Sequence, residues 1–286
     1  MTARRRTFRC RAAMTRVATI LIVAGAPITA DAQTSNRQAL MIGGTWSGWI
    51  DSARVAQSTL STGAISTQVS IQTSYLAAPL LNLIAASVAG KLPSTSLVLS
   101  TFSSTGSPVS LVKVGYPRIQ EVDLPAADTR NTAPILVGVK FVPATAELGT
   151  PGSYPGPNPI GQALHSNYFH LQFDSLDATT AISIAPMSLV LTDVLKGILP
   201  YLVLTTAVTT STSPVSSQLW ATGVQKWLQS QTTKSGTLTF LASDFKTPLL
   251  VVRFAGVRVK SIVNTTTNPV VTFTMTGIGI QGAAMY

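Results

Sequence analysis

Two stretches of this chain, 140 residues apart, share one pattern, and this recurrence constrains the fold more than any other feature. In each stretch a small hydroxyl residue precedes a proline, Pro108 or Pro248. Mostly apolar residues follow each proline and lead, ten positions later, to an arginine, Arg118 or Arg258. A constant long-range offset is typical of an internal duplication. We therefore predict two similar domains in tandem; the alternative is a chance likeness between two β-rich segments.

Most of the chain from residue 45 onward has the pattern of β-strands. In residues 64–73, Ile65, Val69 and Ile71 fall on one face and polar residues on the other, and a period of two favours a strand. Further strands are expected at 45–50, 52–60, 96–102, 109–116, 118–124, 135–142, 168–175, 178–184, 188–195, 202–209, 237–241, 249–254, 257–263 and 270–280.

A first helix is expected at residues 79–89. The segment begins with Pro79, contains no glycine and ends before Gly90. Proline at the first helical position and glycine just past the end are start and stop signals of a helix.

A second helix is expected at residues 214–229, where Ser213 is a candidate N-cap. Trp220, Val224 and Trp227 lie on one side at helical spacing. We interpret both tryptophans as core residues; the alternative is a platform that stacks on a sugar.

A change in composition predicts the boundary between the domains. Residues 142–164 carry five prolines and four glycines, a composition typical of an extended linker. After it, residues 168–175 resemble residues 47–52, with Asp174 matching Asp51. We predict a lead-in at 33–44, a first domain at 33–142, a linker at 143–164 and a second domain at 165–286. The expected fold is mainly β: two tandem β-barrel or sandwich domains, each with one α-helix.

The N-terminus resembles a secretory signal peptide. A basic region precedes an apolar run at residues 17–26, and Ala30-Asp31-Ala32 offers a small-x-small cleavage site. The run is too short to span a bilayer, and no later segment reaches the roughly 20 apolar residues of a membrane helix. We predict a signal peptide at 1–32, an exported protein and no integral membrane segment. Cys10, the one cysteine, lies in this leader, so a mature chain would hold no disulfide.

Half of the formal net charge of +10 comes from the leader. Six arginines and one aspartate lie before residue 33, which leaves 14 basic and 9 acidic residues in the remainder. These bases are scattered singly, which does not favour nucleic-acid binding. Charged residues are 10% of the chain, against about a quarter in ordinary globular domains. Strand surfaces with so few charges suit contact with other protein. The alternative is that they form a neutral extracellular surface.

Acidic pairs and histidines are the candidates for chemistry. Two carboxylates on one strand could serve acid–base catalysis, but Glu121 with Asp123, and Asp174 with Asp177, lack a third group. We interpret both pairs as solvated edges or turns. His165, the first of two histidines, has His170 and Asp174 nearby, fewer ligands than a metal site usually needs.

Other sequence motifs give no stronger indication of catalysis. The chain has no G-x-S-x-G motif and no glycine-rich phosphate loop. We predict no cofactor, no metal and no enzyme activity. Asn264 begins a glycosylation sequon. Arg118 and Arg258 begin matched strands, either as interface or lumen charges or as rim residues whose stems cover apolar surface.

Three segments of the second half carry a resemblance to a known family: LVLTTAVTTSTSPVSSQLWATGVQKWL (202–228), SGTLTFLASDFKTPLLVVRFAGVRVKSIV (235–263) and NPVVTFTMTGI (268–278). They resemble the tail-tube proteins of contractile phages and the haemolysin-coregulated tube protein of type VI secretion. In the first half, STSLVLSTFSSTGSPVSLVKVGYPRIQEV (94–122) and APILVGVKF (133–141) resemble the C-terminal part of the same pattern.

This resemblance implies a β-barrel or sandwich flanked by a helix, closing into six-fold rings that stack as a hollow tube. Such subunits usually have no export signal, and this chain departs from the family in having one. They also usually have one domain, so three two-domain chains of this protein would supply the six barrels of a ring. The expected function is a self-assembling subunit of a secreted tube or filament, with other copies of the chain as partners. The alternatives are a monomeric two-domain module that binds carbohydrate or protein and, with the least support, a secreted hydrolase.

Overall fold

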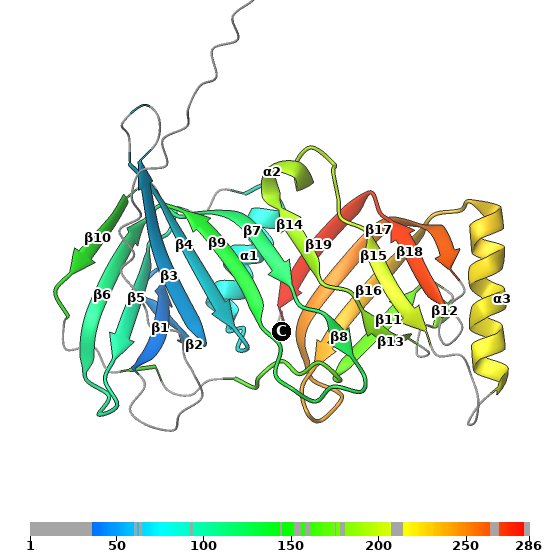
Figure 1. Ribbon diagram of the computed structural model, residues 1–286, viewed down its shortest axis with the longest axis horizontal. Helices are drawn as coiled ribbons and strands as arrows, with labels where there is room; N and C mark the ends of the chain where they lie inside the picture. Colours follow the sequence, from blue (N-terminus) through cyan, green and yellow to red (C-terminus); the bar gives the residue numbers. More distant parts are fainter. Residues whose placement is uncertain are drawn as a thin grey trace, which may run out of the picture.

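The computed structural model describes residues 36–282 apart from 60–61, 63–64, 92–93, 144, 152–155, 158–160, 175, 178–180, 207–213 and 264–268. The expected signal peptide lies outside the described residues. Within them the fold is mainly β, as predicted, with several sheets of which one nearly closes into a barrel (Figure 1).

Two antiparallel sheets make up the first half of the molecule. The first sheet has the order β10 (Thr145–Gly149), β6 (Pro108–Gly115), β5 (Leu97–Phe102), β1 (Arg37–Ile42), β2 (Thr45–Ile50). The second has the order β14 (Met187–Val190), β7 (Arg118–Leu124), β9 (Val137–Val142), β4 (Ile65–Thr73), β3 (Ser52–Thr59).

The strands of the second half form one continuous path. Its order is β12 (Leu176–Asp177), β11 (Phe169–Phe173), β16 (Lys234–Leu241), β17 (Pro248–Val263), β18 (Val270–Thr274), β15 (Leu202–Thr206), β13 (Ala181–Ile184), β8 (Ala127–Asp128). The last strand, β19 (Gly277–Gly282), pairs with the first part of β17. The long strand β17 therefore serves two ladders. Its first part pairs with β16 and β19, and its last part pairs with β18.

Both predicted helices are present. α1 (Ala78–Val88) has Pro79 as its second residue and is followed by Gly90, which has a φ of 76°. α3 (Pro214–Ser230) begins at its proline. A third helix of one turn, α2 (Leu191–Val194), occupies part of the strand predicted at 188–195. That prediction is correct for β14 and wrong beyond it, because apolar alternation does not distinguish a short strand from a strand that ends in a helical turn.

The pairing scheme of the first half recurs in the second. β5 pairs with β6 as β16 pairs with β17, and the pair Leu99–Val112 has its counterpart in Leu238–Val252. In the same way, β4 pairs with β3 and β9, and β15 pairs with β13 and β18. The two longer helices follow these equivalent middle strands: α1 follows β4, and α3 follows β15.

The two matched arginines occupy equivalent register positions. Arg118 lies opposite Val142 and Arg258 lies opposite Thr274. The register then shifts at the same point in both ladders, after Ile119 in β7 and after its counterpart in β17. The 140-residue offset of the sequence is thus an offset between strands that have the same neighbours.

The predicted lead-in and linker are partly wrong. Residues 37–42, expected to be flexible, form β1 in the middle of a sheet. Residues 145–149, expected to be linker, form β10 at the edge of that sheet. β1 carries a continuous apolar run, Ala39–Ile42, and β10 carries alternating apolar residues, Ala146 and Leu148. Each segment gains its backbone hydrogen bonds from neighbouring strands.

Two further expectations need correction. β11 pairs with β16 as β1 pairs with β5, so residues 168–175 correspond to β1. Asp174, which follows β11, is therefore not the counterpart of Asp51, which follows β2. The single strand expected at 270–280 is two strands, because the chain breaks at Met275 and Thr276 between β18 and β19.

The hydrophobic core extends through both halves. Buried apolar side chains from the two sets of sheets form one continuous cluster within the described residues. In the second half Phe173 contacts Trp227 and Phe273, with ring centroids 5.2 and 5.0 Å away. Such aromatic contacts stabilise a core beyond their area alone. The prediction that Trp227 is a core residue is confirmed by its burial.

Candidate assembly interface

The two halves exchange strands. β8 belongs to the first half of the sequence but pairs with β13 of the second. β14 belongs to the second half but pairs with β7 of the first, where Leu189 lies opposite Val122 and both are buried. The boundary expected at 143–164 therefore does not separate two independent units, because each half completes a sheet of the other.

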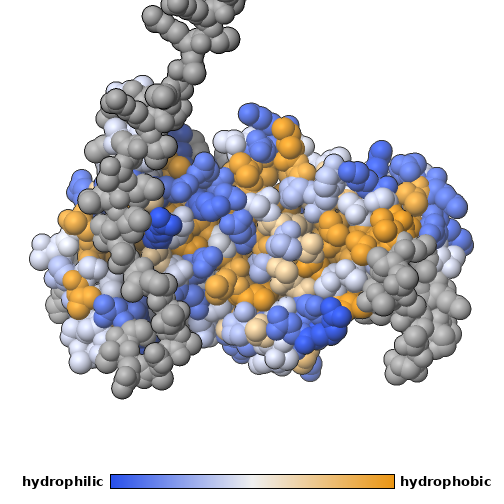
Figure 2. All heavy atoms as spheres, in the orientation of Figure 1, coloured by the Kyte–Doolittle hydropathy of each residue, from blue (hydrophilic) through white to orange (hydrophobic). Residues whose placement is uncertain are grey.

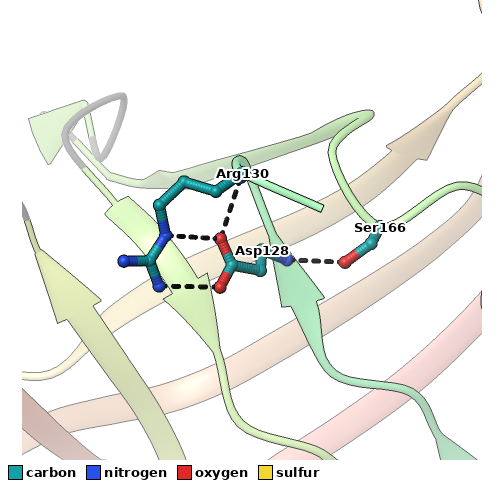
Figure 3. Close-up of polar contacts among 3 residues, drawn as sticks. All are labelled: Asp128, Arg130 and Ser166. Atoms are coloured by element: carbon teal, nitrogen blue, oxygen red, sulfur yellow. Dashed lines mark hydrogen bonds and ion pairs between the residues drawn. The ribbon is translucent and has the colours of Figure 1, made fainter. Parts of the chain in front are cut away.

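Asp128 fixes the chain where β8 enters the second half (Figure 3). Its backbone N–H donates to Oγ of the buried Ser166 at 2.8 Å. Its carboxylate accepts from Arg130 Nε at 3.0 Å and from Nη2 at 2.8 Å. These hydrogen bonds from Arg130 lower the pKa of Asp128. The ion pair is largely exposed, so it stabilises the junction only weakly, and the backbone pairing carries most of the contact.

α1 fills the space between the halves. It packs against β2 and β7 of its own half and against β19 of the other (Figure 1). Ile280 on β19 is 7% exposed. A helix buried on several sides should be apolar around most of its circumference, and Leu80, Leu81, Leu83, Ile84 and Val88 of α1 are all buried.

The surfaces at the two ends of the molecule differ from this junction. β10 and α3 lie at opposite ends of the long axis (Figure 1).

β3 has β4 on one side and, in the described part of the chain, no strand on the other. Its counterpart β13 has β8 in that place. One edge is thus covered within the chain, and among the described residues the equivalent edge is open.

Exposed apolar residues also follow α2. Figure 2 shows hydrophobic side chains near α2 and over strands of the second half. Leu195, Ile198 and Tyr201 are each more than half exposed, and Lys260 lies over the Tyr201 ring, 3.8 Å from its centroid. Apolar groups exposed in one loop commonly mark a contact surface.

A charged cluster crosses the sheet that contains β14. Lys140 Nζ lies 2.6 Å from Glu121 Oε2 and 3.7 Å from Asp123 Oδ2. Ser188 Oγ, from the exchanged strand, donates to Glu121 Oε1 at 2.5 Å. Hydrogen bonds from Lys140 and then Ser188 lower the pKa of Glu121. The structure therefore brings Glu121 and Asp123 together with a lysine of the same half, and the hydrogen bond from Ser188 joins this ion-pair network to the second half.

The remaining candidate residues have structural contacts. His165 Nδ1 lies 2.9 Å from the Thr132 carbonyl oxygen, and the ring contacts Tyr168. His170 lies on β11, opposite Thr239. In the residues that the structure describes, no three His, Cys, Asp or Glu side chains converge as a metal site would require.

Asp174 borders a small pocket. The carboxylate accepts a hydrogen bond from the Ser235 N–H at 2.6 Å, and Asp177 lies on β12. The pocket, of about 220 Å³, is lined by Gln172, Phe173, Asp174, Ser235, Gly236 and Thr237. Small-molecule sites are usually larger. The Trp220 side chain and the Asn264 sequon lie outside the described residues.

Sequence reasoning missed the strands β8 and β10, and it did not predict that β8 and β14 pair with the other half of the chain. The alternation of Ala146 and Leu148 with polar neighbours was the available signal for β10. The exchange itself has no sequence signal, because pairing partners depend on where distant strands end.

Comparison with protein-family models found no matching family, and comparison with curated proteins found no matching sequence. Among the described residues, no helix is both long and apolar enough to cross a membrane.

Proposed function

We propose that this protein is a structural subunit that self-assembles into a secreted hollow tube or filament of stacked rings, with a tail-tube-like fold. The observation that carries the proposal is the contrast between β13 and β3. β13 pairs on its outer side with β8 from the other half, whereas β3, eight residues long, has no strand there in the described part of the chain.

An open strand edge is a surface for pairing with another chain. It presents backbone N–H and C=O groups that can continue the sheet. Within this chain the equivalent edge is already used to join one half to the other. The shared pairing scheme also supports a common origin of the two halves by duplication. Copies joined by contacts like the internal one would form a closed ring, or an open filament if the rotation does not close.

The test is the mass and shape of the chain from residue 33 onward. We expect light scattering to give an oligomer whose mass grows with concentration, and negative-stain microscopy to show rings or tubes on the order of 10 nm across. A compact monomer at the highest soluble concentration would contradict assembly and favour the alternative, a monomeric binding module.

A variant of β3 tests directly whether its open edge takes part in assembly. Gln57→Lys places a charge on β3, where lysine hinders edge pairing. Gln72→Lys, an equally exposed change on the interior strand β4, is the matched control. We expect the β3 variant to assemble less than the control, and equal assembly of the two would count against β3 as a contact.

A further inference from the structure

Leu148 and Ile280 occupy equivalent positions in different surroundings. Leu148 on β10 lies opposite Val112, and Ile280 on β19 lies opposite Val252. Val112 and Val252 are the counterparts in β6 and β17 established by the 140-residue offset. Ile280 is 7% exposed and Leu148 is 83% exposed.

The difference arises from helix α1. It covers β19 from the other half of the chain, and no described segment covers Leu148 to a comparable extent, given its exposure. A leucine in water at an edge strand forgoes the favourable burial that its counterpart has. β10 is thus the counterpart of β19. Among the described residues it lacks the helix that covers β19.

α3 is the element that could complete this contact. α1 packs on β2 and β7, and α3 packs on their counterparts β12 and β17. α3 therefore holds the place in the second half that α1 holds in the first. Since α3 and β10 lie at opposite ends of the molecule (Figure 1), the α3 that reaches β10 must come from a second copy.

The outward face of α3 is exposed where the structure describes its side chains. Val224 and Trp227 are buried against the helix's own half, and Gln225 and Lys226 are exposed on the other side. On β10, Glu147 lies opposite Lys113 in the register and, as the strand neighbour of Leu148, on the opposite face of the sheet. The contact with α3 is therefore made on the face that carries Leu148.

We propose that α3 of one copy docks on β10 of the next copy and covers Leu148, in a head-to-tail contact. This inference rests on the proposed self-assembly but goes further, because self-assembly could also use symmetric pairing of two β3 edges. A head-to-tail contact uses two different surfaces on each chain. Each surface can therefore be disabled separately.

The experiment uses two variants of the chain from residue 33 onward. Leu148→Lys disables the β10 surface, and Lys226→Glu with Gln225→Glu disables the α3 surface. Val263→Lys, which adds a charge at another exposed apolar residue, is the control. Loss of one buried leucine, or the burial of two carboxylates at residues 225 and 226 in the contact, should weaken self-association of each variant about 10- to 100-fold. Circular dichroism checks that each variant is folded.

Mixing the two disabled variants gives the decisive measurement. Each is expected to be monomeric alone, and an equimolar mixture should give a 1:1 heterodimer that grows no further, because one intact β10 meets one intact α3. If the wild type assembles but the mixture stays monomeric, or if either variant assembles like the control, the inference is wrong while the proposed function stands. A wild type that is monomeric at every concentration overturns both.

Discussion

Tyr116 and Gly256 stand at equivalent points, 140 residues apart, and both have left-handed backbone, with φ of 47° and 58°. Tyr116 joins β6 to β7, and Gly256 lies within β17, which continues through the same bend. Both halves therefore bend at this point. Only the second half has glycine there, the residue type that adopts left-handed backbone without strain.

Replacement of Tyr116 by glycine should stabilise the protein. A side chain in left-handed conformation costs about 1 kcal/mol, and the Tyr116 side chain is mostly exposed, so little packing is lost. We expect Tyr116→Gly to raise the free energy of unfolding by up to about 1 kcal/mol in urea denaturation. Val109→Gly, at an exposed residue with ordinary strand geometry, should lower it. A destabilising Tyr116→Gly would show that the tyrosine makes contacts that outweigh the strain.

Replacement of Gly256 by alanine should have the opposite effect. A Cβ there would lie 2.0 Å from Thr276 Oγ1 and 3.0 Å from its Cβ. Gly44 also has positive φ, but a Cβ there would meet nothing within 4 Å. We expect Gly256→Ala to lower the unfolding free energy by about 2 kcal/mol or more, and Gly44→Ala by about 1 kcal/mol. Equal losses would mean that Thr276 moves aside without cost.

The two halves should unfold together. Because β8 and β14 are exchanged and α1 covers β19, each half alone would expose apolar surface that the other covers. We expect one calorimetric transition for the whole chain, and residues 165–286 expressed alone to lack cooperative unfolding. Two separate transitions, or a stable isolated second half, would support independent tandem domains instead.

Trp227 should be the most sensitive residue of α3. It is buried between Phe173 and Phe273, and its Nε1–H donates to the Thr232 carbonyl oxygen at 2.8 Å. We expect Trp227→Ala to lower the unfolding free energy by about 3–5 kcal/mol and Trp227→Phe to cost less. Gln229→Ala, at an exposed residue of the same helix, is the control and should change stability by less than about 0.5 kcal/mol.

Stability should fall in acid, partly because of Glu121. Its pKa in the folded protein is lowered from 4.5 by Lys140 and Ser188. The stabilisation is therefore complete above the unfolded pKa and is lost as the pH falls through the lower folded pKa. We expect the stability difference between wild type and Glu121→Gln to be largest at neutral pH and to shrink below about pH 4.5.

A graded control accompanies this pH series. Ser188→Ala removes the hydroxyl donor but keeps Lys140, so its stability profile should lie between those of wild type and Glu121→Gln. A wild-type difference from Glu121→Gln that stays constant from pH 7 to pH 3 would contradict a role for the cluster.

Much of the fold could be predicted because local patterns are strong where strands are regular. The alternation in 64–73 predicted β4, and Pro79 with Gly90 marked α1 at both ends. The matched prolines and arginines predicted strands that prove to have equivalent neighbours. The failures lie at segments whose structure depends on distant partners: β1 and β10 are short and polar at one end, and their hydrogen bonds come from strands about 60 and 30 residues away.

The candidate interface was predictable only in outline. Low charge and strand-rich surfaces favoured contact with other protein, which stays a prediction. Arg118 and Arg258 lie at the same register position of their ladders, and an interface role for them also stays a prediction. Leu148 carried no signal in sequence, because one leucine between polar residues is common on ordinary strands. Its importance follows from comparison with Ile280 at the same register, which requires the pairing of both edges.

The sequence by itself determined most of the strands, the two longer helices and the 140-residue offset, because side-chain periodicity and proline or glycine backbone preferences act over a few residues. The tertiary structure decided which strands meet: that β8 and β14 cross between the halves, that α1 covers β19, and that β10 is left open. These outcomes depend on how strand edges and apolar faces from distant parts of the chain can be covered at the same time. That condition belongs to the whole packed molecule.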